Sequence, residues 1–357
     1  IRLMAIIDKP SDYFNIKLYT GNATNPTTIS GIGFQPDWVW TKLRAGGTEG
    51  HRLCDSVRGV TKDLFSDASD AQATNLIGLK SFNSDGYVIG NSNGYNINSG
   101  TFVSWNWKAG GTASSNTAGS ITTTISANQT SGFSIIKYAG NSTNSTIGHG
   151  LGAEPEYIIF KEIDGGESWR VWSKYTPSTA SQCLALNLTS AAFSQSGWIS
   201  AVSSSTISIG TDSSINTNGN NYIAYAFAPK QGYSKISSYI GNGNVDGTFI
   251  YTGFKPAFVM VKRTDSTSDW LICDNKRNNY SLSYTQNNFN VVNGKIFPNT
   301  NQVEEFYNSF DFVSNGLKIR SSGTGHNASG GTYIYMAFAE NPFVSSTANG
   351  SIPATAR

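Results

Sequence analysis

The chain has 357 residues, only 13% of them charged, and a formal net charge of +2. No block of Lys or Arg stands out, so the electrostatic footprint of a nucleic-acid-binding protein is missing. No apolar run reaches the ~18 residues of a membrane-spanning helix. Aromatic residues make up 12% of the chain, which argues against a disordered polymer.

Glycine, serine, threonine and asparagine fill the place of the missing charges, and there are only 10 prolines. Together with the aromatics, this composition is typical of short β-strands joined by tight turns. We therefore expect an all-β protein, long enough for two or three domains.

Residues 1–11 are expected to form an N-terminal extension. No signal peptide pattern is visible there. The first residue is Ile1 and the first methionine is Met4, so either Met4 is the translation start or the N-terminus is processed.

The next segment introduces a pattern that recurs twice. It consists of Tyr-x-Gly-Asn, a polar loop, Gly-x-x-Pro, and an apolar strand that ends in Lys. The three copies begin at Tyr19, Tyr138 and Tyr239, have their prolines at Pro36, Pro155 and Pro256, and end at Lys42, Lys161 and Lys262. Internal repeats of this kind define the architecture of a chain.

Each part of the pattern has a physical interpretation. Gly-Asn after a strand supplies turn residues that tolerate positive φ. The proline fixes φ at the first residue of the next strand, where its missing N–H matters least. The apolar run that follows is typical of a strand covered on both faces.

A second block closes each copy. Hairpin signals occur at Gly86, Gly197 and Gly316, and each is followed by a run of alternating aromatic and small residues. Such a run fits an inner strand between two packed layers.

The tyrosine anchors are roughly 100–120 residues apart, which is the size of a domain and not of a solenoid repeat. We predict three tandem β-sandwich modules, jelly-roll or concanavalin-like in type. The ranges are module one at 12–110, a linker with an edge strand at 111–130, module two at 131–229, module three at 236–341 after a short linker, and an extended tail at 342–357.

One segment of module two carries carboxylates with the E-x-D-x-x-E spacing of a retaining glucanase, namely Glu162, Asp164 and Glu167. That chemistry needs two carboxylates about 5 Å apart on one face. Gly165 and Gly166 break the strand between them, and the other modules have polar loops at the same place, 45–48 and 264–267. We therefore expect an exposed hairpin turn with its carboxylates in solvent, and we assign no catalytic residue.

The remaining candidates for chemistry favour structural interpretations. The histidines are scattered at unlike module positions, which predicts solvated loops, and no spacing indicates a metal or cofactor site. No CxxC pair is present, so free thiols are expected, with two of them buried at similar places in modules one and three. The residues concerned are His51, His149 and His326, and Cys54, Cys183 and Cys273, of which Cys54 and Cys273 form the similar pair.

Tryptophans could stack on sugar rings, but those at issue fall on predicted strands. We expect them to pack in the core. They are Trp38, Trp40, Trp105, Trp107, Trp169 and Trp172.

Several segments together resemble a family of uncharacterised structural proteins of marine and cyanobacterial phages. They include Tyr19 to Asn22, Gly33 to Trp40, Asp55-Ser56-Val57-Arg58-Gly59 and the ending Ala339 to Phe343. The resemblance implies a virion or appendage component with lectin-like β-sandwich modules and no catalytic residues. Because modules two and three lack Asp-Ser-Val-Arg-Gly, any role of Arg58 is expected to be confined to module one.

The expected function is therefore that of a non-enzymatic virion protein, a tail fibre, spike or capsid-surface appendage on the particle surface. Its partners would be other virion proteins or host-surface glycans, without nucleic acid and without membrane insertion, and the binding residues are not assigned. A homotrimer is expected by analogy with phage fibres, with a monomer as the alternative. The rivals are a polysaccharide depolymerase and a secreted bacterial lectin or surface-filament subunit.

Overall fold

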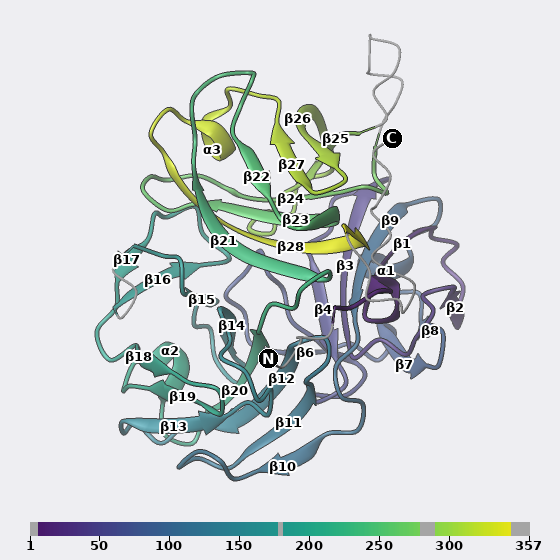
Figure 1. The fold of residues 1–357 in the computed structure, drawn as a ribbon. Helices are drawn as coiled ribbons and strands as arrows, with labels where there is room; N and C mark the ends of the chain where they lie inside the picture. The colour runs from purple at the N-terminus through teal and green to yellow at the C-terminus, as the bar shows by residue number, and fades with distance from the viewer. Residues whose placement is uncertain (1–5, 178–180, 279–289, 344–357) are drawn as a thin grey trace. The chain divides into compact units, whose positions relative to one another are not determined.

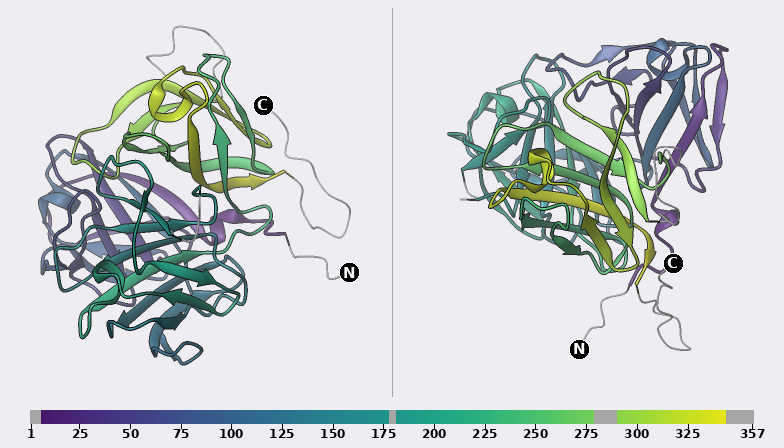
Figure 2. Two further views of the ribbon diagram at one scale, coloured as in Figure 1. Left: turned by 90° about the vertical axis from the view of Figure 1, so that its left-hand side faces the viewer. Right: turned by 90° about the horizontal axis from the view of Figure 1, so that it is seen from above.

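The structure, a computed structural model, describes residues 6–177, 181–278 and 290–343. Within these ranges the chain is all-β. Antiparallel strands make up its sheets, and the helices α1 to α3 are one turn long (Figures 1 and 2). A short 3-10 turn, η1 at Pro10–Asp12, precedes the first strand.

Module one contains two main antiparallel sheets. The first has the order β1-β9-β3-β4 and the second the order β2-β8-β7. The bounds are β1 Phe14–Thr20, β2 Thr27–Ser30, β3 Trp38–Ala45, β4 Arg52–Asp55, β7 Leu79–Asn83, β8 Gly86–Ile89, α1 Asn93–Asn96 and β9 Thr101–Trp107, with the small pair β5 Lys62–Asp63 and β6 Ala73–Thr74 between β4 and β7.

Module two has a larger main sheet, of order β10-β11-β12-β20-β14-β15-β16-β17, and a second sheet β13-β19-β18. The bounds are β10 Ser114–Asn116, β11 Thr123–Asn128, β12 Phe133–Ala139, β13 Ser145–Gly148, β14 Tyr157–Glu162, β15 Arg170–Ser173, β16 Gln182–Ala185, β17 Phe193–Ser194, β18 Ile199–Val202, β19 Thr206–Ile209, α2 Ser213–Asn216 and β20 Asn221–Phe227. The segment predicted as linker and edge strand thus supplies two strands, of which β11 lies between β10 and β12.

Module three forms one eight-stranded sheet of order β21-β28-β23-β24-β25-β26-β27-β22. Its edge strands β21 and β22 follow each other in the chain, and the eight strands form a nearly closed, barrel-like sheet. The bounds are β21 Ser234–Ile240, β22 Phe249–Tyr251, β23 Phe254–Arg263, β24 Trp270–Asp274, β25 Val291–Ile296, β26 Glu305–Val313, β27 Gly316–Ile319, α3 Thr324–Asn327 and β28 Thr332–Pro342. Of the predicted tail, residues 344–357 lie outside the described ranges.

The same four strands form the centre of every module, in the orders β1-β9-β3-β4, β12-β20-β14-β15 and β21-β28-β23-β24. Their registers also agree, because Lys42, Lys161 and Lys262 pair with Val103, Ile223 and Ile334 at the same step of the ladder. Cys54 and Cys273 likewise pair with Val39 and Val259. The predicted equivalence of the lysines and of these two cysteines is confirmed.

The described residues divide into two units. The larger one contains Asp12–Ala228 together with Pro298–Val303, and the smaller one contains Pro229–Phe297 with the described parts of the segments Ile1–Ser11 and Glu304–Arg357. Modules one and two therefore share a unit. Aromatic rings join them, since Trp38 of β3 stacks on Tyr225 of β20 with 4.3 Å between ring centroids.

A buried asparagine closes each module at the last residue of its short helix. Asn96, Asn216 and Asn327 are all 0% exposed. In module two, Asn216 Oδ1 accepts from the Asn141 N–H at 2.8 Å, and its Nδ2 donates to the carbonyls of Thr143 and Gly210, both at 2.7 Å. Asn96 and Asn327 make the corresponding bonds in the other modules.

This closure explains the glycine of the Tyr-x-Gly-Asn pattern. A Cβ on Gly140 would lie 2.3 Å from the Thr217 carbonyl oxygen, and Gly21 and Gly241 meet the equivalent carbonyls at 2.1 and 2.4 Å. The predicted positive φ falls instead two residues later, at Ala23, Ser142 and Gly243. The glycine is required for close backbone approach, which our turn-based interpretation missed.

We predict that Asn216→Ala lowers the free energy of unfolding by about 1–3 kcal/mol, because a buried N–H and two buried carbonyls lose their partner. Chemical denaturation monitored by tryptophan fluorescence measures the change. Asn218→Ala is the control, since that side chain is exposed just beyond the helix. Equal midpoints for the two variants would contradict the closing role of Asn216.

Candidate functional site

Three lysines at the same register position are buried in the sheets, and all of them are 0% exposed. Lys161 Nζ donates to the carbonyls of Glu162 at 2.8 Å and Gly165 at 3.1 Å, within its own hairpin, and to the Ser69 carbonyl of module one at 3.0 Å. Burial lowers the pKa of Lys161 to about 8. The ammonium therefore holds the β14–β15 loop and a strand-free segment of the neighbouring module together.

The equivalent lysines repeat this arrangement. Lys42 Nζ donates to the carbonyls of Leu43 and Glu49, both at 2.8 Å, and of Asn301 at 3.2 Å. Lys262 Nζ donates to the Ser268 carbonyl in its own hairpin. Burial lowers the pKa of both lysines to about 8, so the terminal Lys of the repeated strand is a structural cation in each copy.

Further contacts attach the segment after β5 of module one to module two. Trp169 Nε1 donates to the Phe65 carbonyl at 2.7 Å, and the Gln72 N–H donates to the Ile163 carbonyl at 2.8 Å. These bonds flank the Lys161–Ser69 contact. Three hydrogen bonds to backbone carbonyls thus contribute to the boundary between modules one and two.

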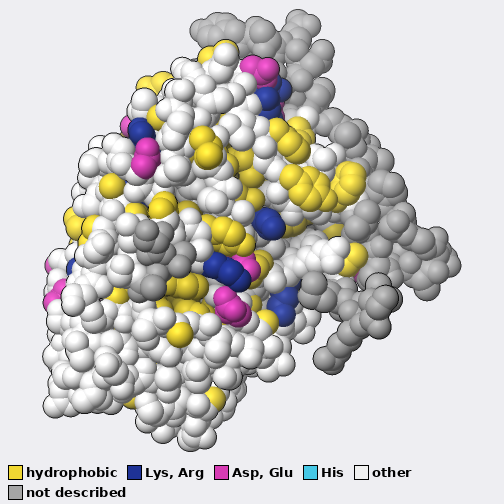
Figure 3. All heavy atoms as spheres, turned by 60° about the vertical axis from the view of Figure 1, so that its left-hand side comes forward, with side chains coloured by type: hydrophobic (Ala, Val, Ile, Leu, Met, Phe, Trp, Pro, Cys, Tyr) yellow, Lys and Arg dark blue, Asp and Glu magenta, His cyan; other side chains and the backbone are white. Residues whose placement is uncertain are grey.

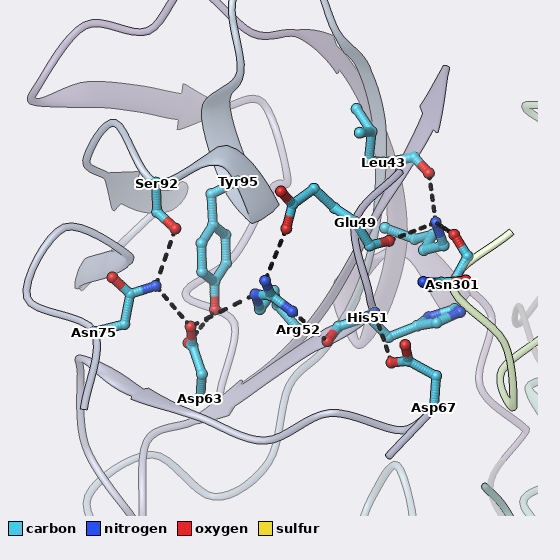
Figure 4. Close-up of polar contacts among 11 residues, drawn as sticks. Leu43, Glu49, His51, Arg52, Asp63, Asp67, Asn75, Ser92, Tyr95 and Asn301 are labelled. Atoms are coloured by element: carbon cyan, nitrogen blue, oxygen red, sulfur yellow. Dashed lines mark hydrogen bonds and ion pairs between the residues drawn. The ribbon is translucent and has the colours of Figure 1, made fainter. Parts of the chain in front are cut away.

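A polar network surrounds Asp63 in module one, and Figure 4 shows the side chains converging on it. Asp63 is 1% exposed and accepts from Tyr95 Oη at 2.6 Å and from Asn75 Nδ2 at 2.8 Å. Arg52 Nε lies 3.9 Å away, and Arg52 also binds Glu49 at 2.9 Å. Burial raises the pKa of Asp63. The carboxylate is enclosed by its partners, which suits a structural anion better than a reacting one.

The histidines are buried, so the prediction of solvated loop histidines is wrong. His51 is 0% exposed; its Nδ1 accepts from Trp40 Nε1 at 2.8 Å, and its N–H donates to Asp67 at 2.9 Å. His149 Nδ1 accepts from the Leu151 N–H at 3.2 Å, and burial lowers its pKa. Polar residues between turn signals resemble loop residues in sequence, and only the tertiary contacts show them to be internal hydrogen-bond partners.

A buried ion pair follows β4 in module one. Arg58 Nε lies 2.5 Å from Asp55 Oδ2, with side chains 1% and 0% exposed, and Tyr225 Oη of module two donates to the same oxygen at 2.8 Å. In module three, Arg277 Nε lies 2.5 Å from Asp274 Oδ2.

From the sequence we expected the role of Arg58 to be confined to module one. That expectation is wrong, because Arg277 has the same role in module three. Both arginines also reach the same backbone carbonyl, Leu53 in one case and Ile272 in the other. Module two replaces the ion pair by Ser173 and Thr176, where Thr176 Oγ1 donates to the Ser173 carbonyl at 2.9 Å. Modules one and three therefore share an Asp-x-x-Arg element, in which the two residues between Asp and Arg differ.

The E-x-D-x-x-E loop is a turn, but its first carboxylate is not in solvent. Glu162 is 4% exposed and accepts from Asn220 Nδ2. Asp164 is exposed and accepts from the Asn221 N–H at 2.8 Å, whereas Glu167 accepts from Ser213 Oγ at 2.9 Å. Each carboxylate thus has its own hydrogen-bond partner.

The sequence predicts free cysteine thiols and tryptophans packed in the core, and the structure agrees with both predictions. Cys54, Cys183 and Cys273 are free and buried, and burial raises the pKa of each thiol to about 12. The six tryptophans are buried core residues, Trp172 being the most exposed of them at 6%.

Among the cavities of the described residues, two have lining side chains relevant to binding. One of about 260 Å³ in module two is lined by Glu154, Trp172, Lys174 and Ile199 to Val202. One of about 180 Å³ in module three is lined by residues around Lys295 and His326. In the described ranges there is no cluster of three or more His, Cys, Asp or Glu able to hold a metal ion.

Few charged side chains are visible on the face of the molecule drawn in Figure 3. The face in Figure 3 is mostly neither hydrophobic nor charged, with scattered blue and magenta side chains. Among the residues that the structure describes, no helix is long and apolar enough to cross a membrane.

The fold and its buried contacts define an all-β protein built from several antiparallel sheets. More specifically, residues 9–342 match a family described as a domain of unknown function, DUF7483, and the chain belongs to that family. No curated protein and no solved structure matches the chain.

We predict that the Lys161 amine titrates near pH 8, well below the ~10.4 of a free lysine. In the folded state the proton leaves first, so the unfolded chain binds more protons between pH 8 and the unfolded pKa. The contribution of Lys161 to the free energy of unfolding therefore rises with pH across that window, by at most about 1.4 kcal/mol per pH unit.

Lysine side-chain NMR measures this titration, and the signal that is missing in Lys161→Met assigns Lys161. The free energy of unfolding of the wild type should increase relative to that of Lys161→Met from pH 7.5 to 10. A signal that titrates only above pH 9.5 would refute the prediction.

For the ion pair, Arg58→Thr should lower the free energy of unfolding by about 3–5 kcal/mol, because Asp55 stays buried without its cation. The matched variant Asp55→Ser/Arg58→Thr copies the residues of module two and should recover part of this loss. Urea denaturation compares the two. A double variant as unstable as the single one would show that the pair itself, and not the stranded charge, determines the loss of stability.

Proposed function

We propose that the protein is a non-enzymatic virion component of a bacteriophage, a tail fibre, spike or capsid-surface appendage. It contacts host-surface glycans or other virion proteins from the particle surface. Its three modules are variants of one β-sandwich of jelly-roll or concanavalin-like type. The observation that carries the proposal is that the ionisable side chains of Lys42, Lys161 and Asp63 are buried in contacts within and between the modules.

The contrast with an active site supports this function. Catalytic groups with shifted pKa values gather in clefts around a place for substrate. Here the ammonium of Lys42 is bonded to three carbonyls and the carboxylate of Asp63 to Tyr95 and Asn75. The oxygens of Glu162 are likewise occupied, which removes the motivation for a depolymerase.

The pattern of likeness between the modules also fits an attachment protein. The strands and their closing asparagines repeat, whereas the loops between them differ in sequence and length. Rigid scaffolds with varied loops are a common basis for recognition. Several weak sites on one chain, multiplied by a homotrimer, would gain ~10²–10⁴ in avidity over one site. The assignment to a phage particle rests on the sequence resemblance alone.

We predict that the purified protein binds cells of a susceptible host and reduces infection when added before phage, without releasing reducing sugar ends from envelope polysaccharide. Flow cytometry, plaque counts and a reducing-end assay give the three measurements. Heat-denatured protein is the control. Release of reducing ends would replace adhesion by depolymerase activity, and absence of cell binding would leave only a structural role in the virion, such as capsid decoration.

A further inference from the structure

One position of the repeat changes its chemistry completely between the modules. The bridge Leu53–Leu64 and the pairs Val171–Leu184 and Ile272–Ile296 are equivalent in register. The residues immediately before the second member of each pair are therefore equivalent too. They are Asp63 in module one, Cys183 in module two and Lys295 in module three.

The residue facing this position comes from the short helix. The third residue is Tyr95 in α1, Ile215 in α2 and His326 in α3. A third neighbour lies on β4, β15 or β24, immediately before the first member of each pair. It is Arg52 in module one, Arg170 in module two and Leu271 in module three.

In modules one and two, other side chains of the same module satisfy the residue at this position. In module one, Asp63 is enclosed by Tyr95, Asn75 and Arg52 (Figure 4). In module two, Cys183 and Ile215 are both buried and apolar in character, and both belong to the hydrophobic core.

In module three, the described residues do not supply an ion-pair partner for Lys295 or a hydrogen-bond partner for His326 Nε2. The Lys295 ammonium lies 4.8 Å from the centroid of the Tyr307 ring, and among the described residues no carboxylate is within ion-pair distance of it. His326 is 4% exposed, and its Nε2 has no hydrogen-bond partner in the part of the chain that the structure describes. Lys295 and His326 line the cavity of about 180 Å³ together with Ser268, Asp269 and Leu271.

The neighbouring carboxylates do not supply the missing anion. Glu305 is the register partner of Lys295 across β26; its charge raises the pKa of Lys295 against the lowering effect of burial, but no ion pair joins the two side chains. Asp269 raises the pKa of Lys262, so its negative charge acts on the structural lysine of the same hairpin. Burial and the charge of Lys295 lower the pKa of His326 to about 3, and the ring is therefore neutral at pH 7.

We propose that this cavity of module three is a binding site for a small oxyanion, a carboxylate or phosphate group, with Lys295 as its counter-ion and Ser268 and His326 as polar neighbours. Lys295 is partly buried, and a partly desolvated cation without an ion-pair partner among the described residues favours such a ligand. At about 30 Å³ for each water in the liquid, the volume corresponds to about six waters. The cavity therefore has room for one charged group or one acidic sugar ring. The site stands independently of the adhesive function proposed above.

The test uses the whole chain and isothermal titration with sodium glucuronate, inorganic phosphate, and glucose as the neutral counterpart of glucuronate. We expect saturable binding of at least one anion with a millimolar Kd and none of glucose. Tighter binding of glucuronate assigns the site to sugar acids, and tighter binding of phosphate assigns it to phosphate groups.

Variants locate the binding. Lys295→Met should weaken it by at least about tenfold. Lys235→Met should leave it unchanged, because that lysine of β21 does not line the cavity. The double variant Lys295→Asp/His326→Tyr installs the residues of module one and should abolish binding while the chain stays folded, as thermal unfolding would show.

Two outcomes would overturn the site. One is the absence of saturable binding of both anions up to about 50 mM, far above a millimolar Kd. The other is equal binding by the wild type and by a folded Lys295→Met or Lys295→Asp/His326→Tyr variant, which would mean an adventitious ion only. Neither outcome bears on cell attachment, which the infection assay measures separately.

Discussion

The structure depends on a buried ammonium group at the end of the repeated apolar strand. A lysine side chain buried at this place loses the water that would hydrate its ammonium group. Arg58 has Asp55 as a buried counter-ion, but among the described residues no carboxylate forms such an ion pair with Lys161. Backbone carbonyls must therefore replace the water, since a buried charge left without hydrogen bonds destabilises the fold far more than one hydrogen bond stabilises it. Satisfying Lys161 requires the following hairpin to turn its carbonyls inward and the Ser69 segment of module one to lie against it. One side chain thus fixes a loop and a module boundary together.

The other polar groups of the core act by the same rule, and the differences between modules show which of them can be exchanged. Asn96, Asn216 and Asn327 are identical because an amide alone can accept from an N–H and donate twice at the same place. The Asp55–Arg58 pair is exchangeable as a unit, since module two uses Ser173 and Thr176 in its stead. Replacement of one member would strand a charge, so changes at such positions must occur in pairs.

Local signals made part of this arrangement predictable. Turn residues, apolar runs and terminal lysines are contiguous in sequence, so the equivalence of Lys42, Lys161 and Lys262 could be established from the residues alone. The partners of these side chains could not. Ser69 lies far from Lys161 in sequence, and Asn216 is indistinguishable from the other asparagines of a polar loop. His51 and Glu162 look solvated for the same reason. D-x-x-R escaped notice in module three because the residues between Asp274 and Arg277 differ from those between Asp55 and Arg58.

Repetition also determines where such a chain can acquire a ligand. A core position must be satisfied either by the fold or by something bound, and module one satisfies its copy with Asp63 and Tyr95, whereas module two makes it apolar. In both cases the scaffold is complete and nothing remains to be recognised. Module three has Lys295 and His326 there, beside a cavity and without a partner anion among the described residues. Since the surrounding strands keep the register of the other copies, this polarity change is tolerated by the fold while altering what the module can bind. Divergence between copies, with the frame of buried lysines and asparagines unchanged, is thus a direct physical route from a structural repeat to a recognition site.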